Sequence, residues 1–577
     1  MALDPITLEV LNNRLRETVL AMEYLLFHSG YSTILRESFD GSAAICDRDG
    51  YLILSAGFPL HLFPYFYSAQ AILRRFPIEQ MQDGDSFLEA DPYIGGVFHV
   101  PDQVIATPVF VDGEAIAFCL SLTHKADVGG MVPGSSGAAA REIYQEGLLL
   151  PPLRYWTKDG VVTDVETIVK RNSRSADALA GDLRAQVGCT RVGAQRLREL
   201  CAEYGTDVIQ EALAELRRLP EQRVRRALES WPDGEAEAES WVDHDGVDLD
   251  RPLRLHVRVI KQGDEITIDY SGMNEQVKGP INLRPQSSHT AGALAVLSSL
   301  DPCIPISDGI RRPIQFVNPE GRITNCRWPA PVNNYFGLTS HIYSTVQRAL
   351  IQFNPRRAVG SAGFGQGAIA IGYKQTRAGR QGVQYEILVS ALGGTPHHDG
   401  TSPVQTIIHV TPNTPVEILE TEYPVRVRCH EWLPDSPGAG RYRGGAGYRK
   451  EYELLTETIC TLRMAHQFKH PGWGVLGGKA PPPARAFVNR GTDRERALAP
   501  LETLELRPGD TFCVELPGGG GYGDPLLREP ERVLADVLDG YVSVEGAKQD
   551  YGVVVDPQRL AVDAEGTAAL RASMQDQ

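Results

Sequence analysis

A β-hairpin with a two-residue turn is the feature that most constrains this fold. Residues 103–111 (QVIATPVFV) and 114–123 (EAIAFCLSLT) are rich in the β-branched and apolar side chains that strands favour. Only Asp112 and Gly113 separate them, and an Asp-Gly pair favours the type I′ turn, whose twist matches that of the paired strands. Because such a turn sets the pairing register, we expect the numbers of opposing residues to sum to about 225.

Histidine and aspartate side chains gather at the open end of this predicted hairpin. In the expected register Asp102 lies opposite Thr123, and His124 lies opposite Pro101, with His99 just before the first strand. Imidazole and carboxylate groups that converge in this way are a ligand set for Zn²⁺ or Mn²⁺. The alternative is that these side chains only cap loops by bonding to backbone groups. Since no short-range metal motif such as HExxH is present, spacing alone leaves both interpretations open.

Length, charge and cysteine content exclude several classes of protein. A chain of 577 residues should form three or four domains of ordinary size. Its net charge of −16 argues against a nucleic-acid surface, which needs a basic patch. Nine scattered cysteines, none in a CxxC pair, fit a reducing compartment better than a disulfide framework. No signal-peptide pattern and no apolar run of roughly 18 residues occurs, so we expect a cytoplasmic protein that makes no contact with membranes.

The first predicted element is a long helix, with Asp4 as its N-cap and Pro5 at its first position. Apolar residues follow at spacings of three and four: Leu8, Leu11, Leu15, Val19, Met22 and Leu26. Such a stripe indicates core packing, and an interface with a partner helix is the weaker alternative.

The remaining pattern predicts an α+β, multi-domain fold with mixed sheets, helical layers and a β-rich C-terminal region. Residues 139–232 carry mostly helical periodicity, whereas 384–522 consist of short β segments such as TIIHV, separated by turns. The glycine-rich stretches 438–448 and 516–525 lack a phosphate-binding motif, and we interpret them as turns. We divide the chain into a metal-binding hairpin region, a helical region, an α+β middle domain, a β-rich domain and a helical tail: 1–138, 139–232, 233–383, 384–525 and 526–577.

Motifs along nearly the whole chain resemble the hydantoinase B family. These are DPITLEVLNNRL, DPYIGGVFHVPD, HKADVGGMVPGS, REIYQEGL, GDLRAQVG, DPCIPISDGIRRPI, TPNTPVEILETEYPVRV, GAGRYRGGAGY, GGGGYGDPL and DYGVVVD. The family includes B subunits of ATP-dependent N-methylhydantoinases, 5-oxoprolinases and caprolactamase, and related subunits of acetone and acetophenone carboxylases.

The resemblance implies that Asp40, His99, Asp102 and His124 bind one Zn²⁺ or Mn²⁺. It also marks His61 and Asp127 as catalytic candidates close to the metal, either of which could serve as proton acceptor. His61 could instead bind substrate or orient a ligand, and Asp127 or Asp91 could accept the free N–H of a ligating histidine. ATP and Mg²⁺ would be bound by a separate A-type subunit, in an (αβ)₂ heterotetramer.

The chain departs from the family pattern at several positions, none of which is a proposed ligand. Ala90, Phe98 and Lys125 replace the usual Asn, Thr and second His of an HH pair, and His397 and His398 are also unusual. These departures bear on the substrate more than on the metal. An aromatic run also follows His61: Phe63, Tyr65, Phe66 and Tyr67. These rings either line an apolar pocket or pack in a core or subunit interface.

Three functions are consistent with this sequence. The first is hydrolysis of a cyclic amide (a lactam, oxoproline or hydantoin) after the partner subunit has phosphorylated the amide oxygen. The second is ATP-dependent carboxylation of a ketone. The third is a non-catalytic scaffold that stabilises its partner. The mass of the product separates the first two, because hydrolysis adds water and carboxylation adds CO₂.

Overall fold

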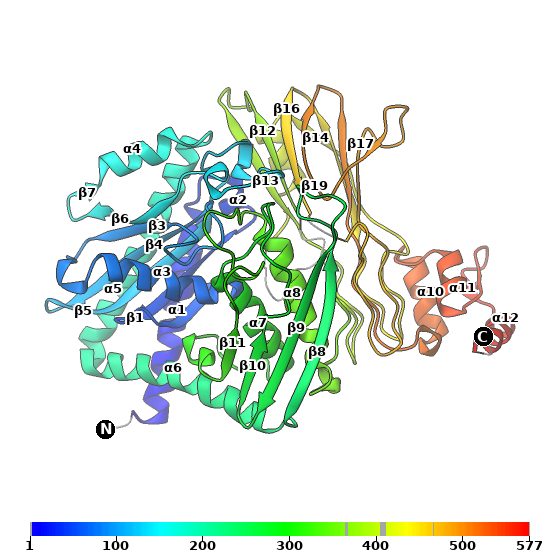
Figure 1. Cartoon of the computed structure of the whole chain (residues 1–577), viewed down its shortest axis with the longest axis horizontal. Coiled ribbons are helices and arrows are strands. Elements are labelled where there is room, and N and C mark those ends of the chain that lie inside the picture. The colour runs from blue at the N-terminus through cyan, green and yellow to red at the C-terminus, as the bar shows by residue number, and fades with distance from the viewer. Residues whose placement is uncertain (1–2, 364–366, 404–410, 465–466, 576–577) are drawn as a thin grey trace.

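The computed structural model describes residues 3–363, 367–403, 411–464 and 467–575. They form a helix-flanked sheet from the first part of the chain, a second smaller sheet, and a β-sandwich followed by C-terminal helices (Figure 1). The predicted α+β class with mixed sheets and a β-rich C-terminal region is confirmed. The predicted strand TIIHV lies outside the described residues.

The largest sheet has seven strands in the order β2-β1-β5-β4-β3-β6-β7. The strands are β1 (Gly41–Asp47), β2 (Leu52–Gly57), β3 (Ser86–Ala90), β4 (Asp102–Val111), β5 (Glu114–His124), β6 (Leu150–Thr157) and β7 (Gly160–Val161). The last two fall in the stretch predicted to be largely helical. That stretch forms helices only further on, in α4 (Thr163–Arg171), α5 (Ala176–Tyr204) and α6 (Thr206–Glu229).

Helices cover both faces of this sheet because its strands are apolar on both faces. On β1, Ala43 and Ile45 pack into one core with α1 (Pro5–His28) and α5. Ala44 and Cys46 alternate with them and face a second core that includes α3 (Leu62–Arg75). Asp4 caps α1 as predicted. The predicted stripe is buried from Leu11 to Leu26, and Leu8 at its start is half-buried. Core packing is therefore the correct interpretation of that stripe.

The predicted hairpin is present, with its register displaced by one residue over most of its length. Asp112 and Gly113 both have positive φ, 51° and 85°, as a type I′ turn requires. Next to the turn the pairing follows the prediction, but a bulge at Ile116 adds one residue to β5. From there on the pairing shifts, so Asp102 lies opposite His124 and not opposite Thr123. The correction brings the two candidate ligands face to face.

A smaller sheet and two helices follow α6 in the chain. The sheet order is β11-β10-β9-β8, and helices α7 and α8 pack beside it (Figure 1). The elements are β8 (Gly234–Val242), β9 (Leu253–Gln262), β10 (Glu265–Asp269), α7 (Pro285–Ser299), β11 (Ile314–Val317) and α8 (Tyr335–Leu350).

Two further sheets face each other as a β-sandwich around one apolar core. One sheet has the order β13-β12-β16-β19: β12 (Gly367–Tyr373), β13 (Gly382–Leu388), β16 (Thr458–Arg463) and β19 (Leu501–Leu506). The other has the order β14-β15-β20-β17-β18: β14 (Val425–Trp432), β15 (Tyr448–Leu454), β17 (Arg485–Val488), β18 (Arg496–Ala497) and β20 (Thr511–Glu515). The short helices α2 (Thr33–Arg36) and α9 (Val416–Glu422) lie outside these sheets.

The two glycine-rich stretches are extended segments packed against each other, and not the predicted turns. The amide of Gly438 donates to Gly519 O at 2.8 Å, and that of Gly519 donates to Gly445 O at 3.0 Å. A Cβ atom on Gly519 would lie 2.0 Å from Leu392 O, and one on Gly444 would lie 1.8 Å from Gly519 O. Glycine is required here because the backbones approach more closely than any side chain allows.

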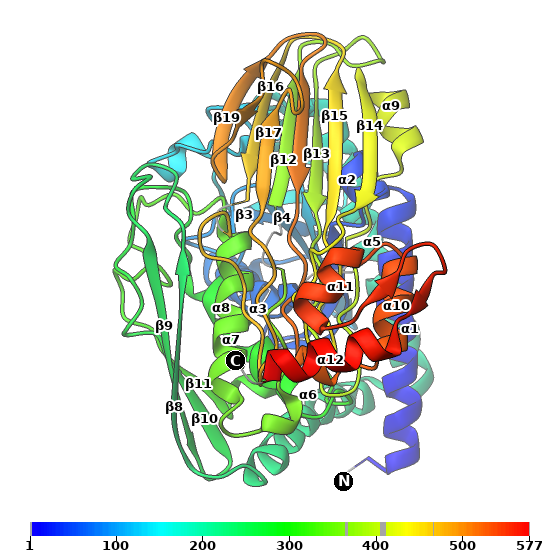
Figure 2. The same cartoon turned by 90° about the vertical axis from the view of Figure 1, so that its right-hand side faces the viewer.

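The C-terminal elements gather beside these glycine-rich segments, below the sandwich in both views (Figures 1 and 2). They are α10 (Pro530–Leu538), α11 (Val544–Tyr551), β21 (Val555–Asp556), β22 (Ala561–Val562) and α12 (Ala564–Gln575). Among the helices of the described residues, none combines the length and the apolar character needed to cross a membrane.

Candidate metal centre

The open end of the β4–β5 hairpin brings three predicted ligands together. Asp102 begins β4 and His124 ends β5, directly opposite each other. A turn closed by the Asp102 amide, which donates to His99 O at 3.1 Å, returns the His99 ring to the same place. All three side chains are buried.

The three donor atoms lie at the spacing of ligands around one ion. His99 Nε2 is 3.0 Å from Asp102 Oδ1 and 3.1 Å from His124 Nδ1, and the His124 and Asp102 atoms are 3.3 Å apart. Tetrahedral ligands at about 2.1 Å from Zn²⁺ are about 3.4 Å from one another. Asp102 Oδ2 and His124 Nε2 are buried and have no hydrogen-bond partner in the described structure. The donor types and their spacing fit a bound divalent ion.

Residues distant in sequence orient His99. Its Nδ1 lies 2.8 Å from Asn333 Oδ1 and 3.0 Å from Asn333 O, so Nδ1–H donates there and Nε2 presents its lone pair to the cluster. The Glu146 carboxylate in turn accepts the Val332 and Asn333 amides at 3.1 and 2.8 Å. The candidate ligand His99 is therefore held in place through Asn333 by Glu146.

Burial and mutual contact set the charges of the cluster. Burial lowers the pKa of His124 to about 4, so this ring is neutral near pH 7, as a metal ligand must be. Burial alone would raise the pKa of Asp102, but the adjacent histidines outweigh it and hold that pKa well below its ordinary value. Asp102 is accordingly a carboxylate.

The fourth predicted ligand, Asp40, lies next to the cluster but does not join the other three donors. Its carbonyl oxygen accepts the His124 amide at 3.1 Å, and its side chain lines the same small cavity as His99 and His124. Burial, and then the negative charge of Asp102, raise the pKa of Asp40 well above its ordinary value. A cation in the cavity would relieve both effects.

The two predicted catalytic residues lie outside the cluster. His61 Nδ1 is 2.6 Å from Ser42 Oγ, which is itself 2.5 Å from Tyr65 OH, and burial lowers the pKa of His61 to about 4. Asp127 accepts from the amides of Gly129 and Gly134 and from Arg174, which pairs with it at 3.0 Å. Asp127 thereby holds the loop that follows His124.

The residues at which this chain departs from the family pattern lie in different surroundings. Lys125 points away from the cluster towards α5, where Nζ donates to Thr123 Oγ1 at 2.6 Å and Gln186 Oε1 at 2.7 Å. Burial lowers its pKa to about 8. The Phe98 ring packs 4.9 Å from that of Tyr335. His397 and His398 are exposed and are not among the residues that line the cavity at the cluster.

The aromatic run after His61 belongs to the core. Phe63 and Tyr65 are buried there, and Phe63, Phe66 and Tyr67 surround the Arg311 guanidinium. The aromatic walls of the cluster come from other segments. The Tyr335 ring lies 4.8 Å from His99, and the Tyr385 ring lies 4.4 Å from His124.

The cavity at the cluster has a volume of about 20 Å³, which is room for a water-sized group. Its lining joins the hairpin to the sandwich and to α8: Asp40, His99, His124, Asn334, Tyr335, Phe336, Ala368, Tyr385, Ile387 and Arg463. Sequence reasoning missed Asn333, Glu146, Tyr385 and Arg463. The motif REIYQEGL contains Glu146, but nothing in the sequence places the other three near the hairpin.

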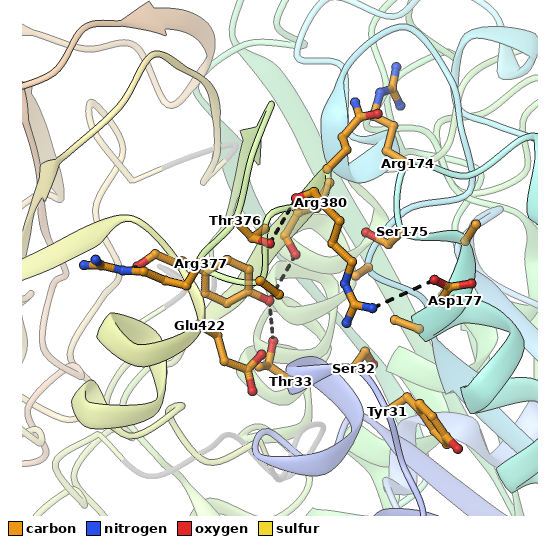
Figure 3. A pocket seen from close by; sticks show the side chains of 18 of the residues that line it. Tyr31, Ser32, Thr33, Arg174, Ser175, Asp177, Thr376, Arg377, Arg380 and Glu422 are labelled. Atoms are coloured by element: carbon orange, nitrogen blue, oxygen red, sulfur yellow. Dashed lines mark hydrogen bonds and ion pairs between the residues drawn. The ribbon is translucent and has the colours of Figure 1, made fainter.

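A much larger pocket, of about 670 Å³, lies between α2, the start of α5, the tip of the β12–β13 hairpin and α9 (Figure 3). Arg380 extends from the hairpin tip towards Asp177 of α5, 3.8 Å away. Ala126 and Val383 line this pocket, two residues from His124 and Tyr385 respectively. Because side chains two apart in a strand share a face, the Val383 and Tyr385 side chains lie on one continuous wall.

Fold and site define a multi-sheet α+β protein with a buried His–Asp–His cluster suited to a divalent metal. A family model described as Hydantoinase B/oxoprolinase matches residues 4–525, and the chain therefore belongs to this family.

Three relatives show the breadth of the family. The chain is 32% identical to the B subunit of a putative D-/L-hydantoinase of Pseudomonas sp. (strain NS671), over 99% of this chain and 98% of that protein. It is 27% identical to the acetophenone carboxylase delta subunit of Aromatoleum aromaticum, over 93% and 84%. The crystal structure of the ATP-dependent caprolactamase from Pseudomonas jessenii superposes with a TM-score of 0.92 at 29% identity, covering 99% of this chain and all of that one.

Proposed function

We propose that this chain is the metal-binding subunit of an ATP-dependent enzyme that hydrolyses a cyclic amide: a lactam, an oxoproline or a hydantoin. The observation that carries the proposal is the convergence of His99 Nε2, Asp102 Oδ1 and His124 Nδ1 within 3.3 Å. The names of the hydantoinase and caprolactamase relatives support the reaction class.

The proposal includes a partner that binds ATP and Mg²⁺. The sequence has no Walker-type GxxxxGK[ST] motif, and several relatives are named as one of the subunits of their enzyme. An unstrained amide is a poor electrophile, so phosphorylation of its oxygen by the partner would supply activation and driving force. We propose an (αβ)₂ assembly by analogy with the family.

Each residue of the cluster has a proposed role. His99, Asp102 and His124 hold Zn²⁺ or Mn²⁺, and Asp40 completes the donor set. Such an ion would lower the pKa of a bound water towards neutrality or polarise the substrate carbonyl. The aromatic walls at Tyr335 and Tyr385 exclude bulk water, which strengthens every charge interaction in the cavity.

We assign Asp127 a positioning role. The loop that it holds carries Ser135, whose carbonyl oxygen accepts the Asn333 side-chain amide, and Asn333 orients His99. His61 retains the proposed role of a proton acceptor, and its Nδ1 is already hydrogen-bonded to Ser42.

We further propose that the substrate enters through the 670 Å³ pocket. The cavity at the cluster is too small for a lactam ring, whereas this pocket has the volume of ordinary ligand sites. Val383 lies on the wall that continues to Tyr385, so a small displacement of β13 would join the two spaces.

A ketone carboxylase is the second candidate function, and the acetophenone carboxylase relative favours it. Water gained by the substrate indicates hydrolysis, and CO₂ gained indicates carboxylation. The scaffold interpretation would prevail if the partner protein turned over as fast without this chain as with it.

Elemental analysis of wild-type protein beside His124→Ala is the deciding experiment. About one Zn or Mn per wild-type chain is expected, with the metal lost from the variant together with ATP-dependent turnover in the complex. Full activity with undiminished metal in His124→Ala would refute the site.

A further inference from the structure

A buried arginine faces the same cavity as the candidate metal ligands. Arg463 ends β16, only 3% exposed, and its guanidinium lines the cavity together with Asp40, His99 and His124. Its donors reach only neutral oxygens: Nη1 donates to Ser136 Oγ at 2.9 Å and to Tyr385 OH, and Nη2 donates to Asn333 O. In the described part of the chain, no carboxylate lies within ion-pair distance of this guanidinium.

The two other arginines buried to a similar degree are paired. Arg443 Nε lies 2.8 Å from Asp536 Oδ1, and Arg528 contacts Asp536 at 2.7 Å and Asp399 at 2.7 Å. An uncompensated buried charge is strongly destabilising, so chains normally provide a partner. Arg443 and Arg528 therefore face carboxylates, whereas Arg463 faces a cavity.

Charge counting indicates what belongs in that cavity. Two carboxylates, Asp40 and Asp102, would balance a divalent ion, while His99 and His124 contribute no charge as ligands. Among the groups that line the cavity, Arg463 then leaves one positive charge in excess. The next acid, Glu146, accepts the Val332 and Asn333 amides and makes no ion pair with Arg463 in the described structure. The cavity of about 20 Å³ admits a water-sized group, which is the size of a single oxygen atom with its immediate space.

We propose that Arg463 and Tyr385 form a subsite for one negatively charged oxygen, belonging to a phosphate or carboxylate group, beside the metal ligands. The inference rests on the proposed metal site and deepens it, because it means that the group received there is an oxyanion and not a neutral amide. The Arg463 guanidinium donates to the Tyr385 hydroxyl, and the Tyr385 ring packs against the ring of His124. Arg463, Tyr385 and His124 therefore form one continuous wall of the cavity.

The subsite is tested on full-length protein loaded with Mn²⁺, by electron paramagnetic resonance at constant ionic strength. Inorganic phosphate and formate are titrated separately, with chloride as the reference salt. Wild type should bind one of these oxyanions saturably. Arg463→Gln should weaken that binding at least about tenfold, because a charged hydrogen-bond donor is lost, with the Mn content unchanged. Arg463→Lys should retain part of the affinity.

A second test variant and a control variant complete the experiment. Tyr385→Phe removes one hydroxyl and should weaken binding severalfold even if Arg463→Gln does not fold. Arg485→Gln, an exposed arginine paired with Glu515 on the sandwich, should bind as wild type does. Preference for phosphate would indicate a phosphorylated substrate, and preference for formate a carboxylate.

Wild-type anion affinity in both Arg463→Gln and Tyr385→Phe, or no anion binding by the Mn-loaded wild type, would overturn the subsite. Turnover of cyclic amides by the complex would in that case still support the proposed function. A chain that takes up no metal would refute both. Anion binding that depends on Arg463, in a complex without amidase activity, would leave the subsite in place and remove only the hydrolase.

Discussion

Asn333 orients His99, one of the candidate metal ligands. Its side-chain and backbone oxygens hold His99 Nδ1 at 2.8 and 3.0 Å, which directs Nε2 to the cluster. Partners of this kind typically contribute tenfold to a hundredfold in metal affinity. We expect Asn333→Ala to lower Zn²⁺ affinity by about that factor in a competition titration with a chelator.

A matched control is Asn489→Ala, which removes a buried asparagine of the sandwich that bonds Asp510 and Thr511. It should lose stability without losing metal affinity. Equal Zn²⁺ affinity in Asn333→Ala and wild type would contradict the positioning role.

We predict that buried His61 makes the free energy of unfolding depend on pH. Burial lowers its pKa to about 4 in the folded chain, while an unfolded histidine titrates near 6.5. Between these values the unfolded chain binds a proton that the folded chain does not, so the free energy of unfolding decreases as the pH falls. The loss is negligible well above pH 6.5 and amounts to about 3 kcal/mol by pH 4.

The measurement is urea unfolding of metal-free protein at pH 7.5 and pH 5, for wild type and His61→Asn. The variant should lose less stability on acidification, and the difference between the two proteins isolates this residue from the other titrating groups. Parallel losses would show that His61 is already charged in the folded protein.

At the residue scale, the clustering of the candidate ligands was predictable from sequence, but the residues that hold them in place were not. His99, Asp102 and His124 come from one hairpin, so a local turn rule brings them together. Asn333 and Arg463 reach the site from segments more than 200 residues further on, through packing that no local pattern encodes. Asp127 was placed near the metal by resemblance, yet its hydrogen bonds hold a loop.

At the scale of elements, the predicted pairing of β4 with β5 was right next to the turn and wrong by one residue at the His–Asp–His cluster. The Asp-Gly turn sets the first pairs, but the bulge at Ile116 adds one residue on β5 alone. Ile116 is an apolar strand residue like its neighbours, so the sequence carries no sign of it. The bulge also places Asp102 directly opposite His124, which is the arrangement that the cluster needs.

Strand β13 links the metal cavity to the large pocket and provides a test of the proposed entry route. Val383→Trp would fill pocket volume two residues from Tyr385, on the same face of the strand. We expect kcat/KM of the complex for its cyclic amide to fall at least about tenfold, since misplacement near the site is costly, while metal content is unchanged.

The control is Lys374→Trp in the same hairpin, an exposed residue that pairs with Glu457 and does not line the pocket. It should leave kcat/KM unchanged. If Val383→Trp is as active as wild type, the substrate reaches the metal by another path.

At the scale of the whole molecule, the site exists only because three distant parts of the chain pack together. The hairpin supplies the candidate ligands, the loop before α8 supplies Asn333, and the sandwich supplies Tyr385 and Arg463. The glycine-rich segments fix this arrangement, because Gly519 lies against Leu392, four residues beyond the end of β13, and against Gly438 and Gly445.

Gly519→Ala tests this packing. The new Cβ would lie 2.0 Å from Leu392 O, a backbone atom that cannot move without displacing the segment. We expect a loss of about 3 kcal/mol or more, seen as a lower midpoint of thermal unfolding. Gly188→Ala is the matched control: it lies within α5, nothing is within 4 Å of its Cβ, and it should gain about 0.5–1 kcal/mol. Similar midpoints for the two variants would mean that the glycine-rich segments do not pack as closely as described, and the glycines would then need another explanation.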